Sequence, residues 1–426
     1  MNRRDVLRGL ELVVESGQRE LTRDLNNLTP SVTKRGVAML RLRIQAYVAM
    51  VICLLPALET YGAEKEPKQL QTGTLGGVPN PDGAALRAMH EGSYILHARG
   101  GKLTNVPVEK VKLPGKLGEE GTPIAMGPDG AVYVIRHTIM CKSTDGGRTW
   151  QSHKHAPELN GFFQILADGT LTCVTQDLHV WASKDEGRTC NKLADIKLPA
   201  EPFMRYVVFG LDLLPEGTLL CRVKLYGIES TGKDTLLLYR STDNGQSWQG
   251  PYKLADWSSQ GGMVVTPSGK LLATLRYQRD LQESDPPWLK EESASRGPGY
   301  SGAYKHLFLA DSSDNGLTWQ NLRPLTTVYG QCYGCPAVQS DGTVVVIHDT
   351  RYGPGHRGSR AMVSYDEGQT WADEVYYLTY TEDRAEPSFS VVLEDDTILS
   401  IVGADNTWQG PIDLFAIRWK PQKEEK

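Results

Sequence analysis

Four arginines occupy positions from which a guanidinium group could bind a carboxylate. Each lies at the start or the end of a short apolar segment with the alternation typical of a β-strand: Arg136, Arg205, Arg276 and Arg351. Arg presents a planar fork of N–H donors, which pairs with a carboxylate through two parallel hydrogen bonds. If the fold gathers these side chains around one pocket, the sequence predicts a binding site for an acidic sugar.

Carboxylates, phenols and imidazoles occur at the same strand ends and could supply acid–base chemistry. They are Tyr277, Tyr333, His137, His348, Asp349 and Glu386. Counting seven residues past the glycine of each strand-connecting turn gives His137, Gln176, Lys224, Arg276 and Asp349. Arg276 is therefore the one arginine in this register, and the sequence indicates its place in the site more clearly than that of the other three.

Metal, nucleotide and nucleic-acid chemistry have little support in the sequence. The Cys332–Cys335 pair has CxxC spacing, but no second pair and no nearby pair of histidines completes a zinc site, so structural thiols or a local disulfide are expected. Motifs for binding a phosphate or a dinucleotide are absent, and no cofactor is expected. With 46 Lys and Arg against 51 Asp and Glu, the chain also lacks the basic excess typical of nucleic-acid partners.

A repeated segment indicates how these residues are positioned. Five stretches follow the pattern Ser-x-Asp-x-Gly-x-Thr/Ser-Trp, with Cys190 replacing Trp once: residues 143–150, 183–190, 241–248, 312–319 and 364–371. The Asp can accept hydrogen bonds from nearby backbone N–H groups, and the Gly can adopt a positive φ. Each segment is therefore predicted to form a tight turn between two strands.

A second turn precedes each repeated segment, between two further apolar strands. These turns are Asp129-Gly130, Asp168-Gly169, Glu216-Gly217, Ser268-Gly269 and Asp341-Gly342, and Asp395-Asp396 is a sixth without a following repeat. Six units with room for four strands each predict an all-β fold, a six-bladed β-propeller over residues 91–420. The last unit lacks an outer strand, and we expect residues 92–113 to supply it and close the ring.

The geometry of a propeller selects one face for the site. If the strands of each blade are labelled A to D from the axis outward, the A–B turns and the repeated segments share one face. The B–C and D–A connections share the other, where A strands start and B strands end. The four arginines belong to that second face, and the long connection from Gln278 to Tyr304 overhangs it.

The five repeated segments resemble the Asp boxes of the sialidase superfamily, over about residues 90–420. The resemblance implies a glycosidase that releases a terminal sialic acid, in which arginines hold the substrate carboxylate. It also implies a Tyr nucleophile activated by a Glu and an Asp acid/base. On this chain the roles fall to Tyr333, Glu386 and Asp349, with Arg136, Arg205, Arg276, Arg351 and Tyr277 binding the substrate.

Two other functions fit the same sequence. A propeller enzyme could cleave uronic-acid polymers, with His137 or His348 as acid/base. A propeller without catalysis could bind a glycan or a protein, because Asp boxes also occur outside sialidases. The expected partner of an enzyme is a glycan or glycoconjugate, and neither nucleic acid nor a membrane, beyond a signal segment, is expected for any of these functions.

The N-terminus has the features of an export signal. Arg41 and Arg43 precede an apolar run at residues 44–58, which is short for a membrane span. We expect residues 1–63 to be an N-terminal extension with this signal-like segment and a true start at Met39. Residues 64–90 are predicted as a linker and residues 421–426 as a charged tail, in a secreted or periplasmic protein.

Overall fold

The computed structural model describes residues 74–75, 78–79, 81–114, 123–136, 138–284, 287, 304–325, 331–350, 357–381, 384–385, 388–405 and 413–423. The chain divides into two compact units, Met1–Lys68 and Gln69–Lys426, and all described residues belong to the second. The predicted signal segment therefore lies outside the described residues. Within those residues, no helix has the length and apolar character needed to cross a membrane.

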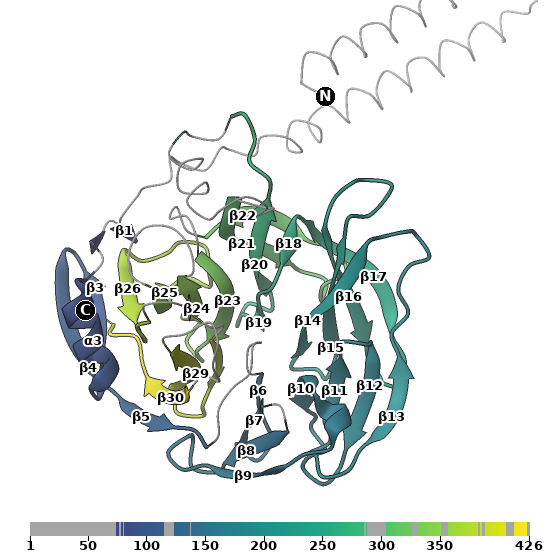
Figure 1. Cartoon of the computed structure of the whole chain (residues 1–426), viewed down its shortest axis with the longest axis horizontal. Coiled ribbons are helices and arrows are strands. Elements are labelled where there is room, and N and C mark those ends of the chain that lie inside the picture. The colour runs from purple at the N-terminus through teal and green to yellow at the C-terminus, as the bar shows by residue number, and fades with distance from the viewer. Residues whose placement is uncertain are drawn as a thin grey trace, which may run out of the picture. The chain divides into compact units, whose positions relative to one another are not determined.

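Six antiparallel sheets of the second unit form the blades, and they confirm the predicted six-bladed β-propeller (Figure 1). The first blade consists of β6 (Ile124–Met126), β7 (Val132–Arg136), β8 (Ile139–Ser143) and β9 (Gln151–Lys154). The second consists of β10 (Gly161–Ile165), β11 (Leu171–Thr175), β12 (His179–Ser183) and β13 (Asn191–Asp195), preceded by the short helix η1 (Pro157–Leu159). The third consists of β14 (Arg205–Leu213), β15 (Leu219–Tyr226), β16 (Thr235–Ser241) and β17 (Gln249–Asp256).

The remaining blades have divided inner strands or additional outer ones. The fourth contains β18 (Ser258–Ser259), β19 (Met263–Val265), β20 (Leu271–Arg279), β21 (Tyr304–Ser312) and β22 (Gln320–Pro324). The fifth contains β23 (Gln331–Val338), β24 (Val344–Thr350), β25 (Gly358–Ser364), β26 (Glu374–Tyr377), β3 (Tyr94–Arg99) and β4 (Lys102–Pro107). The sixth contains β27 (Arg384–Ala385), β28 (Phe389–Val392), β29 (Ile398–Asp405), β30 (Asp413–Trp419) and β5 (Glu109–Lys112).

The predicted closure of the ring by residues 92–113 is right for one strand and wrong for two. Strand β5 pairs with β30 and becomes the outer strand of the sixth blade. Strands β3 and β4 instead extend the fifth blade to six strands, because β3 pairs with β26. The N-terminal part of the propeller therefore joins two neighbouring blades.

A helix lies within the stretch predicted as linker. Helix α3 (Gly83–Glu91) begins at Asp82, whose side chain accepts a hydrogen bond from the Ala85 N–H. Its buried residues Leu86 and Met89 pack with apolar side chains of β3 and β26. A two-stranded hairpin, β1 (Thr74–Leu75) and β2 (Val78–Pro79), precedes the helix. Part of the predicted linker is thus packed against the fifth blade.

All five repeated segments form the same turn between the third and fourth strand of a blade, and we call them the repeat turns. In the third blade, Asp243 Oδ1 accepts hydrogen bonds from Ser241 Oγ and from the Ser247 N–H, both at 2.8 Å. The Ser247 hydroxyl donates to Asp243 Oδ2, and Ser241 Oγ accepts from the Gly245 N–H. Gly245 has a φ of 87°, which satisfies the glycine requirement predicted from the sequence. Equivalent bonds recur in the other four turns.

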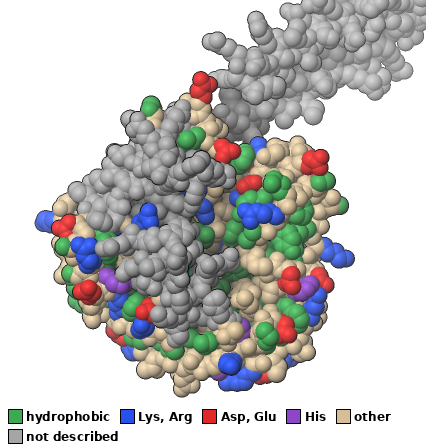
Figure 2. All heavy atoms as spheres, viewed as in Figure 1, with side chains coloured by type: hydrophobic (Ala, Val, Ile, Leu, Met, Phe, Trp, Pro, Cys, Tyr) green, Lys and Arg blue, Asp and Glu red, His purple; other side chains and the backbone are tan. Residues whose placement is uncertain are grey.

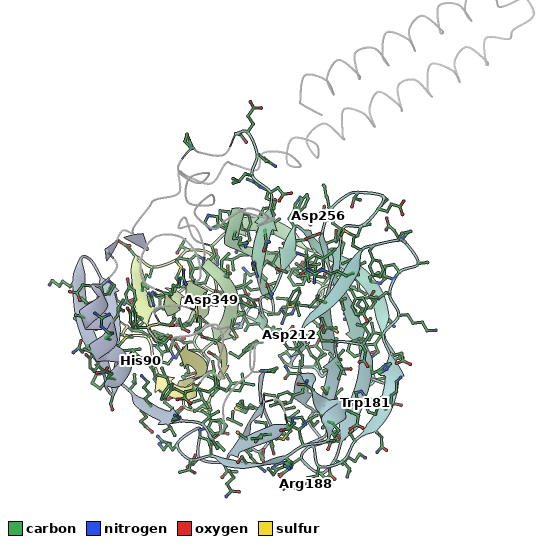
Figure 3. All side chains as sticks on the ribbon, in the orientation of Figure 1. His90, Trp181, Arg188, Asp212, Asp256 and Asp349 are labelled. Atoms are coloured by element: carbon green, nitrogen blue, oxygen red, sulfur yellow. The ribbon has the colours of Figure 1, made fainter. Side chains whose placement is uncertain are left out.

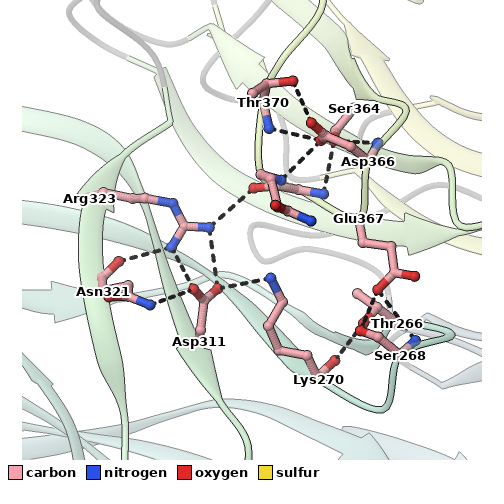
Figure 4. A network of polar contacts seen from close by, with 12 residues as sticks. Thr266, Ser268, Lys270, Asp311, Asn321, Arg323, Ser364, Asp366, Glu367 and Thr370 are labelled. Carbon is pink, nitrogen blue, oxygen red and sulfur yellow. Dashed lines mark hydrogen bonds and ion pairs between the residues drawn. The ribbon is translucent and has the colours of Figure 1, made fainter.

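Side chains next to the repeat turns connect neighbouring blades. Arg323 of the fourth blade donates to Asp311 at 3.0 Å and to the carbonyl of Gly368 in the repeat turn of the fifth blade (Figure 4). Glu367 of that same repeat turn reaches back to the backbone N–H of Ser268 at 3.3 Å. The repeat turns therefore stabilise the contacts between blades as well as single hairpins.

Candidate functional site

The third blade places two cations at the ends of its two innermost strands. Arg205 starts β14, and its guanidinium carbon lies 4.0 Å from the centre of the Tyr226 ring. Lys224, near the end of β15, places its ammonium nitrogen 4.2 Å from the same ring centre. Arg205 and Tyr226 are register partners, and residues two apart on a strand share a face. One aromatic ring therefore lies within cation–π distance of two cations of the third blade.

Lys224 is buried, with only 2% of its surface exposed, and forms an ion pair with Asp234 at 2.9 Å. Burial lowers the pKa of Lys224, the bond to Asp234 partly offsets this, and the positive charges of Arg276 and Arg205 lower it further. The pKa of the Tyr226 phenol is raised by burial, against the opposing effect of both arginines. These shifts show that Arg276 of the fourth blade acts electrostatically on the same group of side chains.

A chain of hydrogen bonds connects Arg276 with Tyr333. Arg276 Nη1 donates to Gln260 Oε1 at 2.9 Å, and Arg276 Nη2 donates to Gln278 Oε1 at 2.5 Å. Gln260 Nε2 in turn donates to the Tyr333 hydroxyl at 2.6 Å. The Arg276 guanidinium carbon also lies 5.5 Å from the centre of the Tyr333 ring. The predicted residues Arg276 and Tyr333 are thus brought together, although they lie in different blades.

A β-bulge positions Tyr333. In the pairing of β23 with β24, Cys332 is opposite Asp349 and Cys335 is opposite Ile347, so β23 contains one extra residue. Tyr333 adopts a φ of 50°, which a non-glycine residue rarely does and which costs free energy. The next carbonyl, of Gly334, accepts a hydrogen bond from the buried Thr274 hydroxyl of β20 at 2.6 Å. The contact between the fourth and fifth blades therefore maintains the strained conformation that directs Tyr333 towards Gln260.

We call these seven residues the cationic cluster: Arg205, Lys224, Tyr226, Gln260, Arg276, Gln278 and Tyr333. They come from the starts of inner strands and the ends of second strands in the third, fourth and fifth blades. This is the face opposite the repeat turns, as the sequence predicted. Three cations on one such surface, together with amide and phenol groups, can bind an anionic group of a ligand.

Two predicted site residues are packed inside the protein, namely Tyr277 and Asp349. The Tyr277 ring stacks on Phe308, with ring centres 4.5 Å apart, and packs against the apolar cluster of the third and fourth blades. Successive residues of a strand face opposite sides, so Arg276 and Tyr277 cannot both belong to the cluster. Asp349, near the end of β24, has no exposed surface. This burial does not support the predicted role of Asp349 as an acid/base that touches the substrate.

His348, the alternative acid/base, is also completely buried. Burial lowers its pKa to about 3, and the charge of Arg360 contributes in the same direction. A histidine of this kind is neutral at pH 7 and has no proton to donate as a cation. The structure therefore does not favour His348 as the acid of a glycan-cleaving reaction.

Several predicted site residues are not placed. Glu386, Arg351 and His137 lie outside the described residues, and Arg136 ends β7 but its side chain is not described. Their proposed roles stay predictions. In the view of Figure 3, Asp212 and Asp349 lie towards the middle of the ring, whereas Trp181 and Arg188 lie near its rim.

Asp212 contributes to a contact between blades rather than to the cluster. Its carboxylate accepts from Arg222 Nε at 2.8 Å, and Arg222 also donates to the carbonyl of Gly261 in the fourth blade. A side chain at Gly210 would collide with Arg222, because a Cβ there would lie 1.9 Å from its Nη2. Gly210 therefore lets Arg222 cross from the third blade to the fourth.

Four members of the cluster were not predicted as site residues: Lys224, Tyr226, Gln260 and Gln278. A signal for Lys224 was present, since it follows its turn glycine by seven residues, as Arg276 does. Gln176 shares this register but bonds both backbone groups of Val208 in the next blade. Register alone therefore does not distinguish a binding residue from a structural one.

The six cysteines that the structure describes are free thiols, including Cys332 and Cys335. Of the two expected states of this pair, the structure contains the structural thiols and not the disulfide. Within the described ranges, no group of three or more His, Cys, Asp or Glu side chains is arranged to hold a metal ion. On the face shown in Figure 2, described acidic and basic side chains are interspersed with apolar ones.

Comparison with known proteins supports the fold and leaves the family open. No family model matches this chain, and no curated protein matches it. A protein of unknown function from Dyadobacter fermentans has a TM-score of 0.50 at 16% identity, covering 76% of this chain and 98% of that one. The α-L-arabinofuranosidase Arb93A from Fusarium graminearum, solved with an iminosugar inhibitor, has a TM-score of 0.51 at 14% identity over 73% and 97% of the two chains. The Hadza microbial sialidase Hz136 has a TM-score of 0.49 at 14% identity over 70% and 65%.

Proposed function

We propose that this propeller is a glycoside hydrolase that acts on a glycan ending in an acidic sugar. The observation that supports this most is the convergence of Arg205, Lys224 and Arg276 around the strand ends of two neighbouring blades. Charge-assisted hydrogen bonds from such groups contribute about 1.5–3 kcal/mol each, which is enough to select an anionic ligand. The arabinofuranosidase with a similar fold was solved with a sugar-like inhibitor, which is consistent with a glycan ligand.

The finer form of the proposal is a secreted or periplasmic sialidase. In this form the cluster binds the carboxylate of sialic acid, Tyr333 is the nucleophile and Glu386 is its base. Its support is the resemblance of the repeat turns to Asp boxes and the approach of Tyr333 to Arg276. The apolar run at residues 44–58, preceded by Arg41 and Arg43, supports export, which N-terminal sequencing of the native protein would test.

A glycan-binding propeller without catalysis is the second candidate, and one observation favours it. Asp349, the predicted acid/base, has no exposed surface, which does not suit a residue that exchanges protons with a bound sugar. Such a site could bind a polysaccharide of uronate units as well as a sialoside.

Activity and binding assays separate these candidates. The wild-type protein is incubated with a fluorogenic α-sialoside and with a panel of uronate oligosaccharides, and affinity for each acidic sugar is measured by calorimetry. Turnover of the sialoside supports the sialidase, turnover of uronates supports the second hydrolase, and binding without turnover supports the binding propeller. If the protein neither cleaves nor binds any acidic glycan, the proposed function is wrong.

The cluster is tested by Arg276→Lys, which keeps the charge and loses the bonds to both amides. We expect the affinity for the acidic sugar to fall about ten- to a hundredfold, corresponding to the loss of one charge-assisted bond. Arg279→Lys, on the same strand and three residues away, is the matched control and should change affinity less than twofold. Equal effects of the two substitutions would contradict the assignment.

A further inference from the structure

Trp257 differs from the other described tryptophans in its surroundings. Each of the other six packs in or against an apolar cluster of the blades: Trp150, Trp181, Trp248, Trp319, Trp371 and Trp419. Trp257 is half-buried, and among the described residues it belongs to none of these clusters. Packing of the core therefore does not explain a large aromatic side chain at this position.

The backbone of Trp257 is held in a conformation that a bulky residue rarely adopts. Its φ is 57°, in the left-handed region, which costs free energy for a residue other than glycine. Two hydrogen bonds of 2.7 Å hold this conformation, because the Trp257 N–H donates to the Asp234 carbonyl and the Trp257 carbonyl accepts from the Gln278 N–H. Asp234 belongs to the third blade and Gln278 to the fourth. Strain that neighbouring elements maintain in this way is typical of functional sites.

Trp257 lies between two parts of the cationic cluster. Asp234, one of its backbone partners, forms the ion pair with Lys224 at 2.9 Å. Gln278, the other partner, belongs to the cluster and accepts a hydrogen bond from Arg276 at 2.5 Å. Trp257 also connects β17 to β18, so it lies on the face of the propeller that carries the cluster. An aromatic side chain thus borders the proposed site of the acidic sugar.

We propose that Trp257 forms a second sugar subsite, on which the sugar ring next to the acidic one stacks. The indole has a broad apolar face, and the C–H groups on one side of a pyranose ring pack on such a face. This inference rests on the proposed function for the acidic sugar. It extends that function, because it assigns the ligand to the acidic oligosaccharides: an acidic monosaccharide occupies the cluster alone, and an acidic disaccharide occupies the cluster and Trp257.

The substitution Trp257→Asn removes the indole and suits the backbone, because Asn adopts the left-handed region more readily than most residues. Affinity is measured by calorimetry for N-acetylneuraminic acid, for glucuronic acid, and for disaccharides that join each of them to galactose through a sulfur atom, a bond that glycosidases do not readily cleave. In the wild type we expect each disaccharide to bind about three- to tenfold more tightly than its monosaccharide. In Trp257→Asn this gain should disappear, whereas the affinity for the monosaccharides should change less than about twofold.

Two further variants separate a binding role from a structural one. Trp257→Phe keeps an aromatic face and should retain part of the gain. Trp319→Phe is the matched control, because Trp319 packs against the apolar cluster of the third and fourth blades and donates to the Gly316 carbonyl at 3.2 Å. It should lower the melting temperature and leave the gain unchanged. Trp257→Asn should have the opposite effects, with no loss of melting temperature, since it relieves backbone strain.

The outcomes distinguish this inference from the proposed function. If the monosaccharides bind but the disaccharides bind no more tightly, or if the gain survives in Trp257→Asn, the second subsite is wrong and the proposed function stands. A lower melting temperature of Trp257→Asn with an unchanged gain would show that Trp257 is structural. If no acidic sugar binds to the wild type, the proposed function is wrong and the second subsite is wrong with it.

Discussion

At the scale of single residues, the lowered pKa of Lys224 makes the properties of the cationic cluster depend on pH. Its ammonium is buried beside Asp234, Tyr226, Arg205 and Arg276, and its pKa is lowered first by burial and then by the two arginines. In the unfolded chain it holds its proton up to the ordinary pKa of about 10.4. Between the lowered pKa and that value the unfolded state binds more protons, so this group makes stability rise with pH.

Binding of an acidic sugar has the opposite dependence. The ligand carboxylate is ionised throughout the neutral and alkaline range, so affinity should fall as Lys224 loses its charge. We expect this fall to begin below the ordinary range of a lysine and to move to higher pH in Lys224→Arg, which stays charged. Calorimetric titrations from pH 6 to pH 10 measure it. Identical pH profiles for the two proteins would show that Lys224 does not contact the anion.

The sequence pattern alone predicted part of the cationic cluster, as Arg276 and Tyr333 illustrate. Arg276 was identifiable because turn glycines define the register of the second strands. Tyr333 was proposed from its place in the chain, but its approach to Arg276 depends on a bulge that adds one residue to β23. No turn residue marks that bulge in the sequence. The strand ends also do not reveal that Tyr277 turns into the apolar cluster between blades.

At the scale of structural elements, the repeat turns have a stabilising role that one substitution tests. Asp243→Ala removes a carboxylate that accepts three hydrogen bonds, one from the Ser241 hydroxyl and two from the backbone N–H and the hydroxyl of Ser247. We expect the free energy of unfolding to fall by about 1–3 kcal/mol, with little change in ligand affinity, because the turn lies on the face away from the cluster. Thermal denaturation and calorimetry measure the two effects. Thr242→Ala, at an exposed position of the same turn, is the control, and a folded Asp243→Ala protein without affinity would contradict the assignment of faces.

The buried carboxylate of Glu374 stabilises the contact of strand β3 with the fifth blade. Glu374 has no exposed surface and accepts hydrogen bonds from Arg99 Nε at 2.9 Å and Tyr365 at 2.6 Å, while His97 Nε2 lies 2.7 Å away. Burial alone would raise the pKa of Glu374, but the bonds from His97, Tyr365 and Arg99 and the charge of Arg99 lower it. Its contribution to stability is therefore present above the ordinary pKa of Glu and is lost as the pH falls through the lowered one.

Glu374→Gln should consequently destabilise the protein strongly at neutral pH. Breaking a buried pair by removing one partner costs about 3–5 kcal/mol, because the other charge is left without compensation. Lys112→Gln removes an exposed ion pair with Asp413, which also joins an N-terminal strand to a blade, and should cost less than about 1 kcal/mol. Urea denaturation at pH 7 and pH 4 measures both. The difference between wild type and Glu374→Gln should shrink at pH 4, and a constant difference would refute the role of the charge.

At the scale of the whole propeller, the repeats predicted the number of blades but not how the chain closes the ring. Six turns in phase with five repeat turns determine six sheets, because each sheet is a local hairpin series. Closure depends on which free edge accepts each N-terminal strand, and β3, β4 and β5 carry no pattern that distinguishes the fifth blade from the sixth. The bonds of Glu374 with His97 and Arg99 join β26 to β3, and β30 pairs with β5.

This division of the N-terminal strands can be tested with chains that start at different residues. A chain that starts at Gln69 retains the whole second unit and should melt like the full-length protein. A chain that starts at Val108 loses α3, β3 and β4 but retains β5, so it should be less stable and still closed. A chain that starts at Leu113 also loses β5, which exposes the N–H and C=O groups at the edge of β30.

We expect the chain that starts at Leu113 to unfold differently from the other two, because its first and sixth blades are no longer joined through β5. Its melting transition should broaden, and the free edge of β30 should promote association between molecules. Thermal denaturation with light scattering after size-exclusion chromatography distinguishes the three chains. If the chains starting at Val108 and Leu113 melt at the same temperature as monomers, β5 is not the strand that closes the ring. If instead only the chain starting at Leu113 associates, closure depends on the four residues Glu109–Lys112, and the preceding strands serve the fifth blade alone.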